Sequence, residues 1–242
     1  SGTAVASQTS PGTPAEKTFL PGGTRRRPSR TTRRCGRTER LSPARGDSSG
    51  FFVFANTVAT RSFSRREEGH GWLGVPFQAE PHEAPSELVI HARLLDDDNW
   101  REQEALGILG MNLLHAAFTH HHRPETLVEA LMDDLAPGRV EIDMINFSGP
   151  AFAGVDNRLM SLHLVRLGFS MAALFTAQGE VVQPADLFYK KPVVVERGTF
   201  RPVTNTTLEI LESAAQQMAA DSRLEGHPPL TLFEMTLRSL LA

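Results

Sequence analysis

With 242 residues, 40% of them hydrophobic, the chain is long enough for one large domain or two small ones. Its formal charge of −3 hides an asymmetry: residues 1–50 carry +7 and residues 51–242 carry −10, which excludes whole-surface attraction of the body of the chain to nucleic acid or anionic lipid. The single cysteine, Cys35, excludes an intrachain disulfide, and the longest apolar run, Ala105–Phe118, is too short to span a bilayer.

Residues 1–50 lack apolar periodicity and are rich in Arg, Ser, Thr, Pro and Gly. The chain holds 22 Arg and three Lys, a ratio typical of a GC-rich coding sequence, and such a gene read out of frame yields this composition. We interpret residues 1–50 as a frameshifted or spurious, disordered basic segment. An authentic disordered tail and a nucleic-acid-binding arm are the alternatives.

Three apolar segments follow. The run Phe51–Ala55 and the segments Trp72–Phe77 and Glu87–Leu94 have the length and apolar content of strands. Residues 81–86 contain two prolines and predict a turn between the second and third segments. We expect the three strands to form an antiparallel meander.

Two helices are predicted next. Aspartates at 96–98 can cap a helix over Asn99–Thr119. Gly107 and Gly110 lie about one turn apart on it, and such a pair permits close packing against a sheet or another helix. A second, amphipathic helix begins at Pro124 and is predicted to run to Leu135.

Strands and helices alternate over the rest of the chain. The predicted strands are 140–146, 171–176 and 192–196, and the predicted helices are 159–167, 184–189 and 206–220. A capping box at Thr206–Glu209 opens the last of these helices, and a final amphipathic segment follows Pro229. This order predicts an α/β domain over residues 51–242, with a mixed sheet and flanking helices.

A glycine-rich loop, Phe147–Arg158, joins the strand at 140–146 to the helix at 159–167. In the structural interpretation, Gly149 and Gly154 supply positive φ angles for a tight turn, and Asp156 caps the helix. In the functional interpretation, the same loop also presents backbone N–H groups at a helix N-terminus to an anion.

Three polar side chains end this loop and are candidates to bind the ligand. Asp156 offers an acceptor, Asn157 both donors and acceptors, and Arg158 a fork that fits phosphate or carboxylate. The loop matches neither the dinucleotide-binding G-x-G-x-x-G pattern nor the P-loop.

A second polar loop spans Arg197–Asn205. We expect Arg201 and Asn205 to join the Gly149–Arg158 loop at one end of the sheet. The residues therefore favour a cytoplasmic domain that binds a nucleotide or another phosphorylated small molecule, with no cofactor or reaction identified. The alternative is a non-enzymatic scaffold or protein-interaction module whose loops only cap helices.

Other candidate residues carry weaker signals. Asp143 lies in an apolar strand, where a buried carboxylate would suit a general base, although the alternation with Glu141 favours the solvent-facing side. The spacing of His120–His122 does not place two imidazoles four residues apart on one helical face, so we predict no metal site. We expect neither a membrane nor a nucleic-acid partner.

The chain from Phe51 to Ala242 resembles an uncharacterised bacterial protein family. The longest shared stretch is Phe-Ser-Gly-Pro-Ala-Phe-Ala-Gly-Val-Asp-Asn-Arg-Leu-Met-Ser-Leu at 147–162, and further matches lie at 51–59, 103–108, 179–184, 189–192 and 196–205. The resemblance implies a longer protein with a different N-terminal segment and a C-terminal extension. We therefore expect an incomplete domain, truncated at the C-terminus.

Names attached to members of that family include TonB-dependent receptor and nicotinate-mononucleotide adenylyltransferase. The residues support neither name, since a receptor of that class needs many lipid-facing strands and the adenylyltransferases carry a His-x-Gly-His loop that is missing here. The resemblance supplies no catalytic residue.

Overall fold

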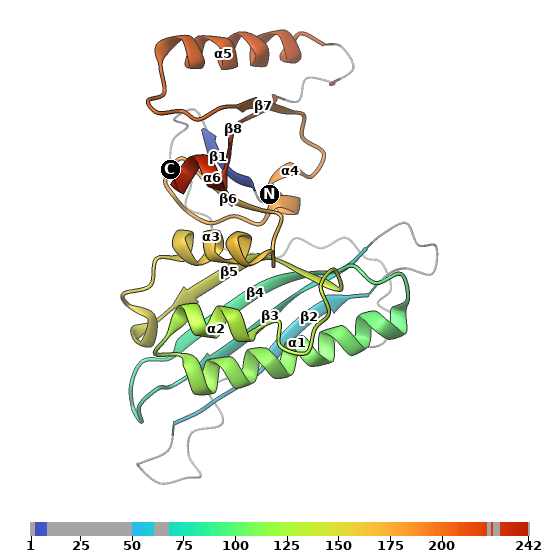
Figure 1. The fold of residues 1–242 in the computed structure, drawn as a ribbon, viewed down its shortest axis with the longest axis vertical. Coiled ribbons are helices and arrows are strands. Elements are labelled where there is room, and N and C mark those ends of the chain that lie inside the picture. Colours follow the sequence, from blue (N-terminus) through green and yellow to red (C-terminus); the bar gives the residue numbers. More distant parts are fainter. Residues whose placement is uncertain (1–2, 9–49, 61–67, 222–223, 225–227, 242) are drawn as a thin grey trace, which may run out of the picture.

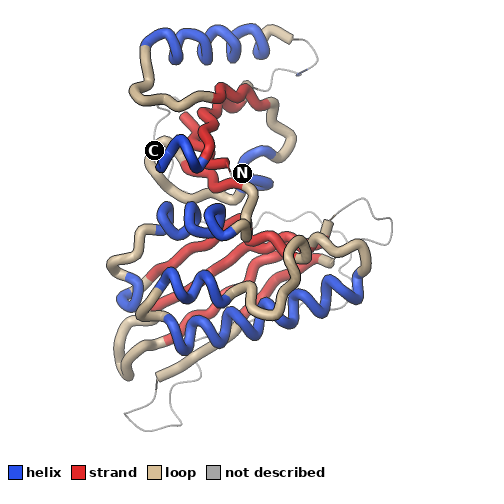
Figure 2. Tube along the Cα trace, viewed as in Figure 1, coloured by secondary structure: helices blue, strands red, loops and turns tan. Residues whose placement is uncertain are grey.

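The computed structural model describes residues 3–8, 50–60, 68–221, 224 and 228–241. Over these ranges the chain forms two four-stranded sheets with helices packed against them (Figures 1 and 2). The predicted α/β class is confirmed. In the described ranges, no helix combines the length and apolar character needed to cross a bilayer.

The first sheet is antiparallel, in the order β2-β3-β4-β5. Its strands are β2 (Ala55–Ala59), β3 (Gly69–Phe77), β4 (Ser86–Leu94) and β5 (Val140–Ser148). The predicted meander is confirmed, but its first strand begins at the end of the predicted run. Phe52 makes only an isolated bridge to Phe77, and the continuous ladder starts at Ala55.

Two helices cover one face of this sheet. Helix α1 (Asn99–His120) confirms the predicted helix, and its N-cap Asp98 accepts a hydrogen bond from the backbone N–H of Trp100 (3.2 Å). Its fully buried side chains recur every three or four residues and belong to one hydrophobic core with alternate residues of β3 and β4. This face of the sheet holds the main hydrophobic core, and we call the opposite side the outer face.

Only one of the paired glycines of α1 has the close neighbour expected for it. A Cβ on Gly110 would lie 3.2 Å from the Phe54 ring, whereas Gly107 has nothing within 4 Å of that position. Helix α2 (Pro124–Ala130) is shorter than predicted. The Asn112 side chain of α1 donates to the carbonyls of Leu131 and Asp133, which holds the chain in turns where the predicted helix would have continued.

The second sheet is mixed, in the order β6-β1-β8-β7. Its strands are β6 (Ala172–Phe175), β1 (Thr3–Gln8), β8 (Leu230–Thr236) and β7 (Val193–Arg197). The β1–β6 and β7–β8 pairs are parallel, and the β1–β8 pair is antiparallel. Strand β1 lies in the N-terminal segment, where no element was predicted. The rest of that segment, with Cys35, lies outside the described residues.

Three helices accompany the second sheet. They are α4 (Pro184–Phe188), α5 (Asn205–Ala219) and α6 (Leu237–Leu241). The predicted capping box at Thr206 is wrong: the N-cap of α5 is Thr204, whose hydroxyl accepts the backbone N–H of Thr207 at 3.3 Å. The final amphipathic segment is a strand, β8, over most of its length and a helix only at its end.

Helix α3 (Asn157–Leu167) lies between the two sheets (Figure 1). It contacts β5 of the first sheet and β6 of the second. Gly168 ends it in the left-handed conformation, at φ 78°. The loop that precedes α3 is the predicted ligand loop, so the fold places that loop near the junction of the two sheets.

Candidate functional site

The start of the ligand loop is fixed by contact with β4. Gly149 adopts φ 90° and ψ 177°, a backbone conformation open essentially to glycine alone. A Cβ there would lie 2.5 Å from Ser86 Cα and 2.6 Å from the Pro85 carbonyl oxygen. The backbone N–H of Ala151 donates to the buried hydroxyl of Ser86 at 2.9 Å. Gly149 therefore has the positive φ predicted for it and lets the loop pack closely against β4.

Asn157 fastens the end of the loop to β5. Its side-chain oxygen accepts the backbone N–H of Phe147 (2.7 Å), and its amide nitrogen donates to the Phe147 carbonyl (3.1 Å) and to Asn146 Oδ1 (3.0 Å). Both ends of the amide are therefore already bonded. Asn157 lines the site through its position, and its polar atoms hold α3 against the sheet.

Asp156 and Arg158 form a closed pair at the N-terminus of α3. The Asp156 carboxylate accepts the backbone N–H of Arg158 (2.9 Å), which confirms the predicted cap. It also accepts Arg158 Nε at 3.0 Å and Nη2 at 2.7 Å. Hydrogen bonds from the Arg158 side chain, then from its backbone, lower the pKa of Asp156 to about 2.

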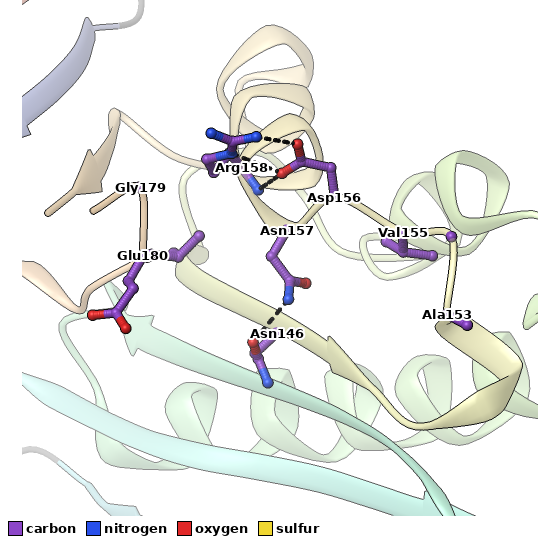
Figure 3. Close-up of a pocket in the computed structure, with 10 residues that line it drawn as sticks. Asn146, Ala153, Val155, Asp156, Asn157, Arg158, Gly179 and Glu180 are labelled. Carbon is purple, nitrogen blue, oxygen red and sulfur yellow. Dashed lines mark hydrogen bonds and ion pairs between the residues drawn. The ribbon is translucent and has the colours of Figure 1, made fainter. Parts of the chain in front are cut away.

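A pocket of about 700 Å3 opens beside this pair (Figure 3). It is lined by Asn146 of β5, by residues 153–158, and by Gly179, Glu180 and Val181 of the turn that follows β6. Gly179, at φ 83°, brings the turn against Arg158: a Cβ there would lie 3.2 Å from Arg158 Nη1. Figure 3 shows the Glu180 side chain directed away from the Asp156–Arg158 pair.

Gly154 differs from its predicted conformation. It is not among the described glycines with positive φ, so the prediction of a left-handed residue at this position is wrong. A Cβ on Gly154 would have nothing within 4 Å, and the residue lines the pocket. Gly154 therefore contributes open space beside the α3 N-terminus.

The structure does not bring Arg201 and Asn205 into this pocket. Both follow β7 of the second sheet, whereas the Gly149–Arg158 loop follows β5 of the first. The Arg201 guanidinium donates to the backbone carbonyl of Leu240, and Asn205 begins α5. Neither residue lines the pocket.

Comparison of the chain with protein-family models, with curated proteins and with solved structures finds no match. The family resemblance stays a prediction. Function is therefore inferred from the geometry of the chain.

Asp143 is the remaining sequence candidate, and its surroundings differ from the prediction. It lies on the outer face, as alternation indicated, yet it is only 7% exposed because Gln183 covers it, with Gln183 Nε2 3.4 Å from Asp143 Oδ2. Sequence reasoning missed its partner, the buried His91 of β4. A histidine within an apolar strand was the available signal, but the pairing of β4 with β5 was needed to connect the two residues.

Proposed function

We propose that the chain binds a phosphorylated small molecule, such as a nucleotide, in the pocket at the N-terminus of α3. The observation that carries the proposal is the exposed Arg158 guanidinium in the lining of a pocket that residues 153–158 border. Its bonds to Asp156 use Nε and Nη2. The Nη1 group, beside Gly179, lies on another edge of the fork, which a phosphate can engage.

The Asp156 carboxylate determines which ligands fit best. It already occupies the end of the α3 dipole and neutralises Arg158, so an anion alone gains little there. A ligand that adds hydroxyl or amino donors can bond the carboxylate while its phosphate meets Arg158. A nucleotide, with its ribose hydroxyls, provides both kinds of group, and we therefore expect it to bind more tightly than inorganic phosphate.

A thermal-shift screen tests the proposal. The panel pairs nucleotides and sugar phosphates with the corresponding nucleosides and sugars, and includes inorganic phosphate. A ligand at 100 times its dissociation constant adds about 2.7 kcal/mol of stability, which for a chain of this size raises Tm by roughly 5–10 °C. We expect a shift from a phosphorylated compound and little or none from its counterpart without phosphate.

Three variants locate the site. Arg158→Gln should abolish the shift, whereas Arg201→Gln should leave it, because Arg201 does not line the pocket. Asp156→Asn keeps a good N-cap and removes the charge that holds the guanidinium, so it should lower the dissociation constant of inorganic phosphate. Loss of binding in Arg201→Gln with retention in Arg158→Gln would contradict the assignment.

If no compound in the screen binds, the chain is better explained as a scaffold or protein-interaction module. A scaffold function is favoured because the loop residues already make contacts that stabilise the fold. Gly149 packs on Ser86, Asp156 caps α3, and Asn157 is hydrogen-bonded to β5. In that case Arg158→Gln would change nothing except the local ion pair.

A further inference from the structure

The outer face of the first sheet contains a chain of hydrogen-bonded side chains that runs from the interior to the surface. His91 Nδ1 lies 2.5 Å from Asp143 Oδ1, and His91 Nε2 lies 3.3 Å from His70 Nδ1. Asp143 and His91 are buried, at 7% and 2% exposure, whereas His70 is exposed. We call these three residues the relay. They do not line the pocket at α3.

A β-bulge brings the buried pair together. His91 pairs with Met144 and Ala92 pairs with Ile142, so Asp143 has no cross-strand partner in the ladder. Bulges redirect a side chain, and here the carboxylate meets the imidazole on the neighbouring strand. Trp72 holds the other side of the imidazole, with ring centroids 4.8 Å apart. His91 is thus held between Trp72 of β3, Asp143 of β5 and Gln183, whose Nε2 lies 3.4 Å from His91 Nδ1.

We assign the protons along the relay from the hydrogen-bond partners. An ionised Asp143 accepts only, and at 2.5 Å it is a closer neighbour of His91 Nδ1 than Gln183 Nε2 at 3.4 Å, so the assignment places the proton of His91 on Nδ1 and its lone pair on Nε2. That lone pair accepts His70 Nδ1–H, which leaves the lone pair of His70 on Nε2, across its ring from His91. A basic nitrogen on an exposed histidine, connected through a second imidazole to a buried carboxylate, is an arrangement that suits a general base.

Arg93 lies directly across from His70 on β4 and is bound to Glu68 and Glu141, each at 2.6 Å. A guanidinium therefore lies beside the relay on the outer face of the sheet.

We propose that His70 is the catalytic base of a hydrolytic site for small carboxylic esters, with His91 and Asp143 as positioning residues. His70 Nε2 takes a proton from water, and the water oxygen forms a bond to the acyl carbon. The bond from that carbon to the alcohol oxygen then breaks, and His70 returns the proton to the departing oxygen. Ester and water give carboxylic acid and alcohol, with no other reactant.

The side chain beside His70 suggests the kind of ester. Trp72 lies two residues along the same strand and faces the same side, so its indole lies on the same surface of the sheet as the base. An ester with a planar aromatic group can pack on such a surface. Arg93 has five N–H groups, of which the bonds to Glu68 and Glu141 account for two, so others can meet the oxyanion that develops.

The test uses 4-nitrophenyl acetate as the probe and release of 4-nitrophenol as the readout, with free imidazole at the same concentration as the reference. A positioned general base contributes roughly 100-fold or more over the same reaction without it. We expect the wild-type chain to exceed both free imidazole and His70→Gln, the latter by that order, and the control His122→Gln, at another exposed histidine, to match the wild type. A wild-type rate equal to imidazole, or a His70→Gln rate equal to wild type, would overturn the proposal.

Asp143→Asn separates catalytic positioning from a structural role. Losing the carboxylate that orients His91 should lower kcat for 4-nitrophenyl acetate and leave KM unchanged, since Asp143 does not touch the ester. A purely structural Asp143 would change Tm and leave kcat in place, which would refute its role in the relay.

A measurement on the unmodified chain covers the case in which Asp143→Asn fails to fold. Nitrogen-15 NMR of the imidazoles reports the tautomer of each histidine. The relay predicts the proton of His91 on Nδ1 and that of His70 on Nδ1. A proton on His91 Nε2 would rule the relay out.

Discussion

Replacing Gly149 by alanine should destabilise the first sheet much more than the same change at Gly154. At Gly149, φ 90° with ψ 177° costs a side-chain-bearing residue roughly 1–3 kcal/mol. The added Cβ would also lie 2.5 Å from Ser86 Cα, which is backbone, so the sheet or the loop has to move at a further cost of about 1–3 kcal/mol. We expect a total near 4 kcal/mol, a large part of the 5–15 kcal/mol typical of a folded domain.

Gly154 provides the matched control within the same loop. Its φ is not positive and an added Cβ meets nothing within 4 Å, so Gly154→Ala should change the free energy of unfolding by less than about 0.5 kcal/mol. Urea unfolding followed by tryptophan fluorescence measures both variants, because Trp72 and Trp100 lie in β3 and α1. If Gly149→Ala lowers the free energy of unfolding by less than about 1 kcal/mol, the loop does not depend on this contact and the prediction is wrong.

Three further predictions follow from the described contacts. Asn157→Ala leaves the buried N–H and carbonyl of Phe147 without their partner and should cost about 1–3 kcal/mol in urea unfolding. Because the pKa of Asp156 falls from 3.8 to about 2, its bonds stabilise the fold fully above pH 4 and are lost as pH drops through 2, so the stability difference between wild type and Asp156→Ala should vanish over that range. Leu113→Ala, at a fully buried position of α1, should cost about 2–5 kcal/mol by calorimetry or urea unfolding.

Elements set by local signals could be predicted from the sequence. Helix α1 follows directly from its aspartate N-cap and its long apolar pattern. The cap of α3 at Asp156 needed only the residues next to it. The meander was predictable because its strands are adjacent in the chain and separated by turn residues.

Elements that depend on distant pairing could not be predicted. Strand β1 is stabilised between β6 and β8, more than 150 residues away in the chain, and its own six residues carry little strand signal. The sequence predicts a single amphipathic segment where the structure has β8 and α6. The strand could not be recognised because the pairing of β8 with β1 and β7 is not visible in the sequence. Local pattern does not contain this information.

The same limit applies to the candidate site. Arg201 and the Gly149–Arg158 loop both follow strands, and only the topology shows that those strands belong to different sheets. From the sequence, Asn157 is a candidate to bind the ligand. Only the structure shows that its side chain is hydrogen-bonded to the backbone of Phe147. The relay joins residues 21 and 52 positions apart through the register of three strands and one bulge.

Amide chemical-shift mapping tests the central claim, ligand binding at the α3 N-terminus, most directly. The nitrogen-15-labelled chain is titrated with a pool of nucleotides and sugar phosphates, and then with the matching nucleosides and sugars. We expect shifts concentrated at residues 153–158 and 179–181 with the phosphorylated pool, and their loss in Arg158→Gln. Shifts that map elsewhere, or that persist unchanged in Arg158→Gln, would contradict it.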